Sequence, residues 1–134
     1  MKQCQNKKLE NMKNPVTYFE IPVLDLDRAI KFYTTIFNFS FQKEIIDHYE
    51  MALFPFSDSS NGITGALVKG DVYKPTKEGV IIYFHTESID NTLELIQKYP
   101  ATILYPKTSV GSNGFVAEFE DSEGNRIALH EPLI

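Results

Sequence analysis

The pattern of apolar and polar residues along the chain predicts one succession of elements that occurs twice. Residues 16–23 are rich in β-branched and aromatic side chains and predict a strand. Three further strands are expected over residues 39–46, 49–56 and 63–68. Between the first two strands, apolar residues recur at helical spacing after a capping residue, Asp25. The apolar stripe of this predicted helix consists of Leu26, Ala29, Ile30, Tyr33, Ile36 and Phe37.

The second half follows the same order. Residues 80–86 predict a strand, Ser88 can cap a helix, and Pro100 ends that helix. Its stripe consists of Ile89, Leu93, Ile96 and Tyr99, and strands follow over residues 101–105, 115–120 and 125–131. Asp25-Leu26-Asp27 and Ser88-Ile89-Asp90 stand 63 residues apart, as do Asp58-Ser59 and Asp121-Ser122. An internal repeat at a fixed offset indicates two copies of one βαβββ unit.

The predicted fold class is therefore α+β, with two βαβββ modules. We expect a flexible tail over residues 1–13 and a single domain over residues 14–134. The first module spans about 14–70 and the second about 79–134, joined by the polar connection 69–79. One helix covers only one face of a four-stranded sheet, so two curved mixed sheets placed side by side are expected to enclose a cleft on their open faces.

The composition of the chain limits which classes of molecule it is expected to bind. The formal net charge is −5, which disfavours nucleic acid and suits neutral or cationic ligands. No apolar run approaches the roughly 20 residues of a membrane span. The polar start of the chain has no secretory signal, so a cytoplasmic location is expected. Cys4 is the single cysteine, which excludes a disulfide within the chain.

Three segments resemble the vicinal-oxygen-chelate superfamily, the glyoxalase/bleomycin-resistance/dioxygenase group. They are YFEIPVLDLDRAIKFYTTIF, GALVKG and FEDSEGNRIALHE, within residues 14–132. The resemblance implies the paired βαβββ fold and a small-molecule ligand. In members that bind a metal, His and Glu ligands come from the first and fourth strands of each module. The matching positions here are Tyr18, Gly65 or Ala66, Ile81 and Ala128, which do not form a metal site, so no metal and no other cofactor is expected there.

Side chains two apart on a strand share a face, so polar residues next to these positions inherit an inward orientation. Glu20, His130 and Tyr83 are the predicted catalytic residues, because a carboxylate with a histidine can act as general base and acid. The predicted ligand-binding residues are Tyr18, His85 and Phe54. The alternative is that Glu20 and His130 satisfy each other or the backbone in a polar core. A displaced divalent-metal site that uses Glu20 and His130 is a further alternative.

Three functions are open. The first is a lyase or isomerase that works by proton transfer with Glu20 as base. The second is a protein that sequesters a drug-like ligand without chemistry. The third is a metal-dependent glyoxalase or dioxygenase with displaced ligands. A small molecule is the expected ligand in each case, with no nucleic acid and no membrane as partner. Because each module has an open face and an edge strand, we also expect a homodimer.

Overall fold

The computed structural model describes residues 14–57 and 62–134. The first module contains β1 (Phe19–Val23), α2 (Leu26–Phe37), β2 (Gln42–Ile46), β3 (Tyr49–Leu53) and β4 (Gly65–Lys69). The second contains β5 (Tyr83–His85), α3 (Ile89–Ile96), β6 (Ile103–Ser109), a 3₁₀ turn η1 (Gly111–Asn113), β7 (Phe115–Glu120) and β8 (Arg126–Glu131). This order confirms the predicted pair of βαβββ units. The predicted tail and residues 58–61, which include the repeat landmark Asp58-Ser59, lie outside the described residues.

Both helices begin where their capping residues predict. The Asp25 carboxylate accepts a hydrogen bond from the backbone N–H of Arg28 at 3.0 Å, and the Ser88 hydroxyl accepts one from that of Asn91 at 3.1 Å. The apolar face of α2 is wider than the predicted stripe, because Phe32 is fully buried beside Tyr33. Phe32 packs against Tyr99 and Phe119 of the second module, a contact that helical spacing alone does not reveal.

Each module forms a four-stranded mixed sheet, in the orders β1-β4-β3-β2 and β5-β8-β7-β6. β1 runs parallel to β4 and β5 parallel to β8, while the other pairs are antiparallel. The strands β1 and β5 start later than predicted, because their pairing with β4 and β8 begins at Phe19↔Gly65 and Tyr83↔Ala128. The two sheets are not closed on each other.

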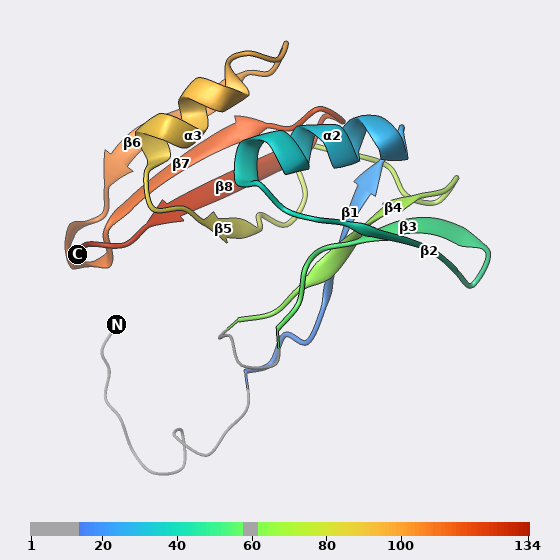
Figure 1. Ribbon diagram of the computed structural model, residues 1–134. Coiled ribbons are helices and arrows are strands. Elements are labelled where there is room, and N and C mark those ends of the chain that lie inside the picture. Colours follow the sequence, from blue (N-terminus) through green and yellow to red (C-terminus); the bar gives the residue numbers. More distant parts are fainter. Residues whose placement is uncertain (1–13, 58–61) are drawn as a thin grey trace.

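A single hydrophobic core joins the modules. The helices α2 and α3 contact each other (Figure 1). One face of each sheet contributes side chains to the core, namely Ile21 and Leu67 from the first sheet and Ile127 and Leu129 from the second. Burying these side chains is the main force that holds the fold together. The opposite side of each sheet faces away from the helices. Within the described residues, no helix is long and apolar enough to cross a membrane; the cytoplasmic location stays a prediction.

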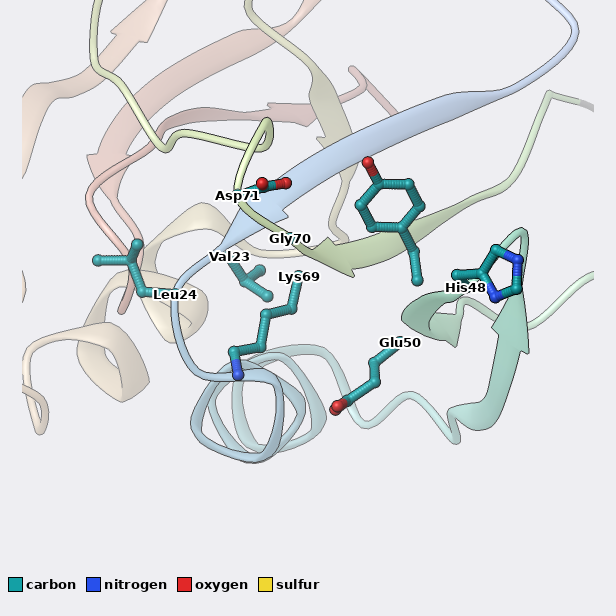
Figure 2. Close-up of a pocket in the computed structure, with 8 residues that line it drawn as sticks. Val23, Leu24, His48, Glu50, Lys69, Gly70 and Asp71 are labelled. Atoms are coloured by element: carbon teal, nitrogen blue, oxygen red, sulfur yellow. The ribbon is translucent and has the colours of Figure 1, made fainter.

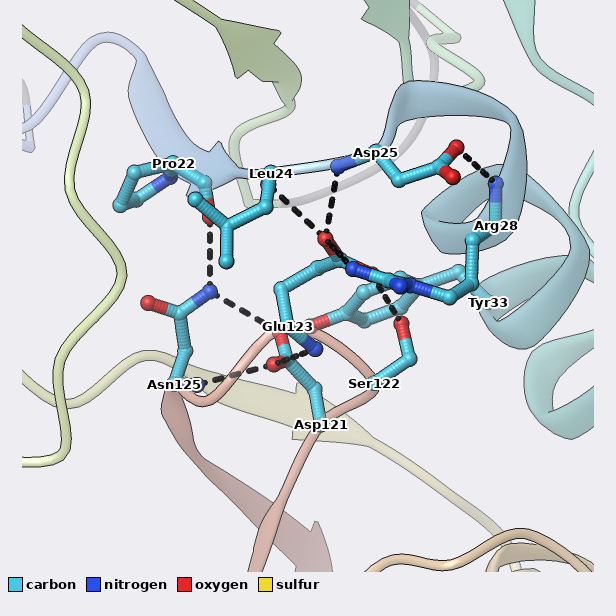
Figure 3. A network of polar contacts seen from close by, with 9 residues as sticks. All are labelled: Pro22, Leu24, Asp25, Arg28, Tyr33, Asp121, Ser122, Glu123 and Asn125. Carbon is cyan, nitrogen blue, oxygen red and sulfur yellow. Dashed lines mark hydrogen bonds and ion pairs between the residues drawn. The ribbon is translucent and has the colours of Figure 1, made fainter. Parts of the chain in front are cut away.

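A buried polar network fastens the turn before β8 to the start of α2 (Figure 3). The Glu123 carboxylate accepts hydrogen bonds from the backbone N–H groups of Leu24 and Asp25, at 2.8 and 2.9 Å, and from the Arg28 guanidinium, at 2.8 and 2.9 Å. Burial raises the pKa of Glu123, but these donors outweigh it and lower that pKa to about 2. The network therefore ties the two modules through an ionised carboxylate.

The same turn reaches further into the first module. The Tyr33 hydroxyl donates to the Asp121 carboxylate at 2.7 Å, and the Asn125 amide donates to the carbonyl of Pro22 at 2.8 Å. Asp121 is buried, and burial raises its pKa despite the hydrogen bonds that it accepts. The polar residues of the turn over residues 121–125 therefore have a structural role.

Candidate ligand-binding site

The strand register defines the open face of the first sheet. Ile21 and Val23 of β1 enter the core, so Tyr18, Glu20 and Pro22 point to the other side. Glu20 pairs in register with Ala66, and Pro22 with Val68. Met51 lies across from Val68, and these three buried residues, Met51, Ala66 and Val68, form a small apolar cluster of their own. We call this side, with Tyr18, Glu20 and the cluster, the open face of the first sheet.

Two tyrosines hold the Glu20 carboxylate on this face. The Tyr18 hydroxyl donates to Glu20 Oε2 at 3.1 Å, and the Tyr73 hydroxyl donates to Oε1 at 3.0 Å. Partial burial and the hydrogen bond to Glu20 together raise the pKa of Tyr18 to about 12. Both phenols therefore keep their protons at neutral pH and act as donors.

Tyr49 and Tyr73 complete the face, and the sequence analysis missed both. Their rings meet edge to face, with 5.2 Å between centroids, against the cluster of Met51, Ala66 and Val68. Gly70 makes room for them, since a Cβ there would lie 2.4 Å from the Tyr49 ring. Tyr49 could have been found from its alternation with Met51 and Leu53. Tyr73 could not, because the connection that carries it has no periodicity.

The open face of the second sheet carries the two predicted histidines. His85 and His130 are register partners, beside Tyr83. These three residues line a depression of about 730 Å³ together with Val110, Ser112, Asn113, Val116, Pro132 and Leu133. His130 Nε2 lies 2.6 Å from the carbonyl oxygen of Asn113. A carbonyl only accepts hydrogen bonds, so this nitrogen donates and a neutral His130 has its free lone pair on Nδ1.

The predicted site residues thus form two groups. Tyr18 and Glu20 line a groove of about 390 Å³ between the modules, whereas Tyr83, His85 and His130 line the separate depression. Both Glu20 and His130 face away from the helices, as strand parity predicts, but one chain does not bring them together. Within the described residues, no ion pair joins Glu20 to His130. The catalytic roles of Glu20, His130 and Tyr83 stay predictions.

Phe54 lies in a cluster of phenylalanine rings under a third groove. Its exposed fraction is 6%, and its ring packs against Phe19, Phe41 and Phe84. The groove above it has a volume of about 510 Å³ and is also lined by Tyr83 and His85. A ligand-binding role for Phe54, Tyr18 and His85 stays a prediction, and the rings around Phe54 serve the core.

Figure 2 shows a further depression at the end of the first sheet. Its volume is about 510 Å³, and it is lined by Val23, Leu24, His48, Tyr49, Glu50, Lys69, Gly70 and Asp71. Asp47 and His48 form the tight turn between β2 and β3 in left-handed conformations, with φ of 51° and 69°. His48 is exposed there. Charges of both signs line this depression, unlike the open face of the first sheet.

A comparison with known proteins identifies the family to which this chain belongs. A family model described as the Glyoxalase/Bleomycin resistance protein/Dioxygenase superfamily matches residues 16–129. The chain belongs to this superfamily. A search of curated proteins gives no match.

Solved structures show the same superfamily fold. UcmS2 is 25% identical, with a TM-score of 0.65 over 90% of this chain and 99% of that chain. Glyoxalase I from Leishmania major, which is trypanothione-dependent, is 22% identical, with a TM-score of 0.69 over 89% and 87%. TnmS3, an antibiotic binding protein from Streptomyces sp. CB03234, is 21% identical, with a TM-score of 0.65 over 90% and 98%.

The superfamily's usual metal does not fit this chain. Gly65 and Ala66 are the two candidate ligand positions on β4. Ala66 pairs with Glu20 and therefore faces the open side, whereas Gly65 pairs with Phe19, which packs against the core. Ala66, Ile81 and Ala128 have no side-chain donor atom for a divalent ion. Among residues 14–57 and 62–134, no three His, Cys, Asp or Glu side chains are grouped to hold a metal.

Proposed function

We propose that this chain is a small-molecule-binding protein of the superfamily that holds an aromatic ligand without transforming it. The observation that carries the proposal is the open face of the first sheet. Tyr18 and Tyr73 fix the Glu20 carboxylate, which lines the groove of about 390 Å³ beside Pro22 and Val80, so one placed polar group stands beside apolar and aromatic surface. Binding sites for small molecules have this composition.

Two observations favour binding over proton-transfer catalysis. Each Glu20 oxygen already accepts a phenolic hydrogen bond, and the side chain is exposed, whereas a general base is commonly buried and unpaired. Three of the four positions that carry the metal in other members, here Ala66, Ile81 and Ala128, lack side-chain donor atoms. TnmS3 is an antibiotic binding protein with the same fold, so the fold is compatible with a binding role.

We also propose that two copies pair as a homodimer. Ile45 and Ile46 of the edge strand β2 are exposed, and both sheets leave one face free of helices. Because one chain keeps Glu20 and His130 apart, a cleft that contains both would need a second copy. Light scattering at micromolar concentration should return about twice the chain mass of 15.3 kDa. A mass of one chain that persists on concentration would contradict the pairing.

Titration with planar aromatic probes tests the function. We expect acridine or proflavine to bind saturably, with one site per chain, as followed by probe fluorescence. The chain contains no tryptophan, so the probe signal has no indole background. Heat-unfolded protein is the control. If neither probe binds up to millimolar concentration, the proposed function is wrong.

A further inference from the structure

The charges on the open face of the first sheet have one sign. The register places Glu44 opposite Met51 and Gln42 opposite Leu53, so these β2 side chains share the face with Glu20. The Gln42 amide donates to the Glu44 carboxylate at 2.8 Å, which agrees with that placement. Among the described strand residues of this face, Glu20 and Glu44 are the charged ones, and both are acidic.

The nearest basic residues are directed elsewhere or already paired. Lys43 alternates to the helix side, where its ammonium meets the Asp27 carboxylate at 2.9 Å. Arg126 lines the same groove as Glu20, but its guanidinium is paired with the Glu118 carboxylate. Within the part of the chain that the structure describes, no Lys or Arg forms an ion pair with Glu20.

Glu20 keeps room for a further partner. An ionised carboxylate has about four lone-pair sites, and the two phenols occupy one on each oxygen. The hydroxyls of Tyr18 and Tyr73 meet it, and the faces of aromatic rings attract cations. Tyr18 is 46% exposed, so a ligand can reach this group from solvent. A fixed negative charge beside π faces complements a cation and repels an anion.

We propose that the open face of the first sheet selects organic cations, namely aromatic ligands that carry a protonated nitrogen, which Glu20 binds. This inference rests on the proposed function and adds the charge class of the ligand. The ring system lies against Tyr18, in the groove that Tyr18, Glu20 and Pro22 line, and the protonated nitrogen donates to the Glu20 carboxylate.

The test compares three probes of one shape at pH 7.5 and low salt. Proflavine is cationic, acridine is neutral and acridine-9-carboxylate is anionic. We expect proflavine to bind about five- to tenfold more tightly than acridine, as for a partly exposed ion pair with a cation–π contribution. The anion should bind most weakly, and added KCl should weaken only the binding of proflavine.

Glu20→Gln should reduce the preference for proflavine to within about twofold, because the amide keeps the shape but removes the charge. Glu50→Gln is the matched control, since Glu50 lines the depression at the end of the sheet and alternates away from the open face. Thermal unfolding should be unchanged in both variants.

Each outcome separates the two proposals. Equal binding of proflavine and acridine would leave the binding function intact and overturn the charge selection. A preference that persists in Glu20→Gln would also overturn it, because another group would then supply the selectivity. Failure of all three probes to bind would contradict the proposed function itself.

Discussion

Glu123→Ala should lower the free energy of unfolding by about 3–5 kcal/mol, because it leaves buried donors and a guanidinium without their partner. The Glu123 side chain has no exposed area and accepts hydrogen bonds from two backbone N–H groups and from Arg28. Domains of this size are stable by only about 5–15 kcal/mol, so this loss is a large share of the total. Urea unfolding followed by circular dichroism measures it.

The effect should depend on pH with a definite sign. The pKa of Glu123 is lowered from 4.5 to about 2 in the folded chain, so between these values the unfolded chain binds more protons. The stabilisation is therefore fully present above pH 4.5 and is lost as the pH falls through about 2. The difference between wild type and Glu123→Ala should shrink over that range. The raised pKa of Asp121 acts in the opposite direction, but it is present in both proteins.

Glu94→Gln is the control for this prediction. Glu94 lies on α3 and is exposed, so its replacement should change the free energy of unfolding by less than about 0.5 kcal/mol. A Glu123→Ala variant as stable as Glu94→Gln would mean that the turn before β8 does not fasten the two modules.

Gly65→Ala should destabilise the chain by about 3 kcal/mol or more, since it forces an atom into the backbone of the neighbouring strand. A Cβ at position 65 would lie 2.0 Å from the carbonyl oxygen of Phe19 and 2.8 Å from its ring. Backbone cannot yield as a flexible side chain can, so β1 would have to separate from β4. The thermal midpoint should fall, and probe binding should weaken with it, because β1 carries Glu20 and directly follows Tyr18.

Gly79→Ala provides the matched comparison. A Cβ there meets only the Thr76 methyl at 3.2 Å, which can move by a few tenths of an ångström. Its thermal midpoint should stay within about 2–4 °C of wild type, which corresponds to less than 1 kcal/mol. Equal thermal midpoints for the two alanine variants would show that the close approach of β1 to β4 is not needed for stability.

Much of the fold follows from local rules. The capping residues Asp25 and Ser88 set the helix starts, and strand parity sets the face on which Glu20 and His130 lie. These features depend on neighbours a few residues apart, which a sequence shows directly. The repeat at a spacing of 63 residues extends the same reasoning from one module to the other.

The partners of the site residues could not be predicted in this way. Tyr73 reaches Glu20 from a connection without periodicity, and the Asn113 carbonyl reaches His130 from a turn. The role of Glu123 depends on residues about a hundred positions away. Such contacts arise from how the two modules pack, which no local pattern records.

The most direct test of the binding site uses the methyl signal of Met51, which is buried beneath Tyr49 and Tyr73 of the open face. The chain has three methionines, Met1, Met12 and Met51, so methyl labelling of methionine gives few signals to assign. Titration with proflavine should shift the Met51 methyl resonance along a saturable curve, with the affinity that probe fluorescence reports. A Met51 signal that stays in place while the probe binds would put the ligand elsewhere and contradict the account.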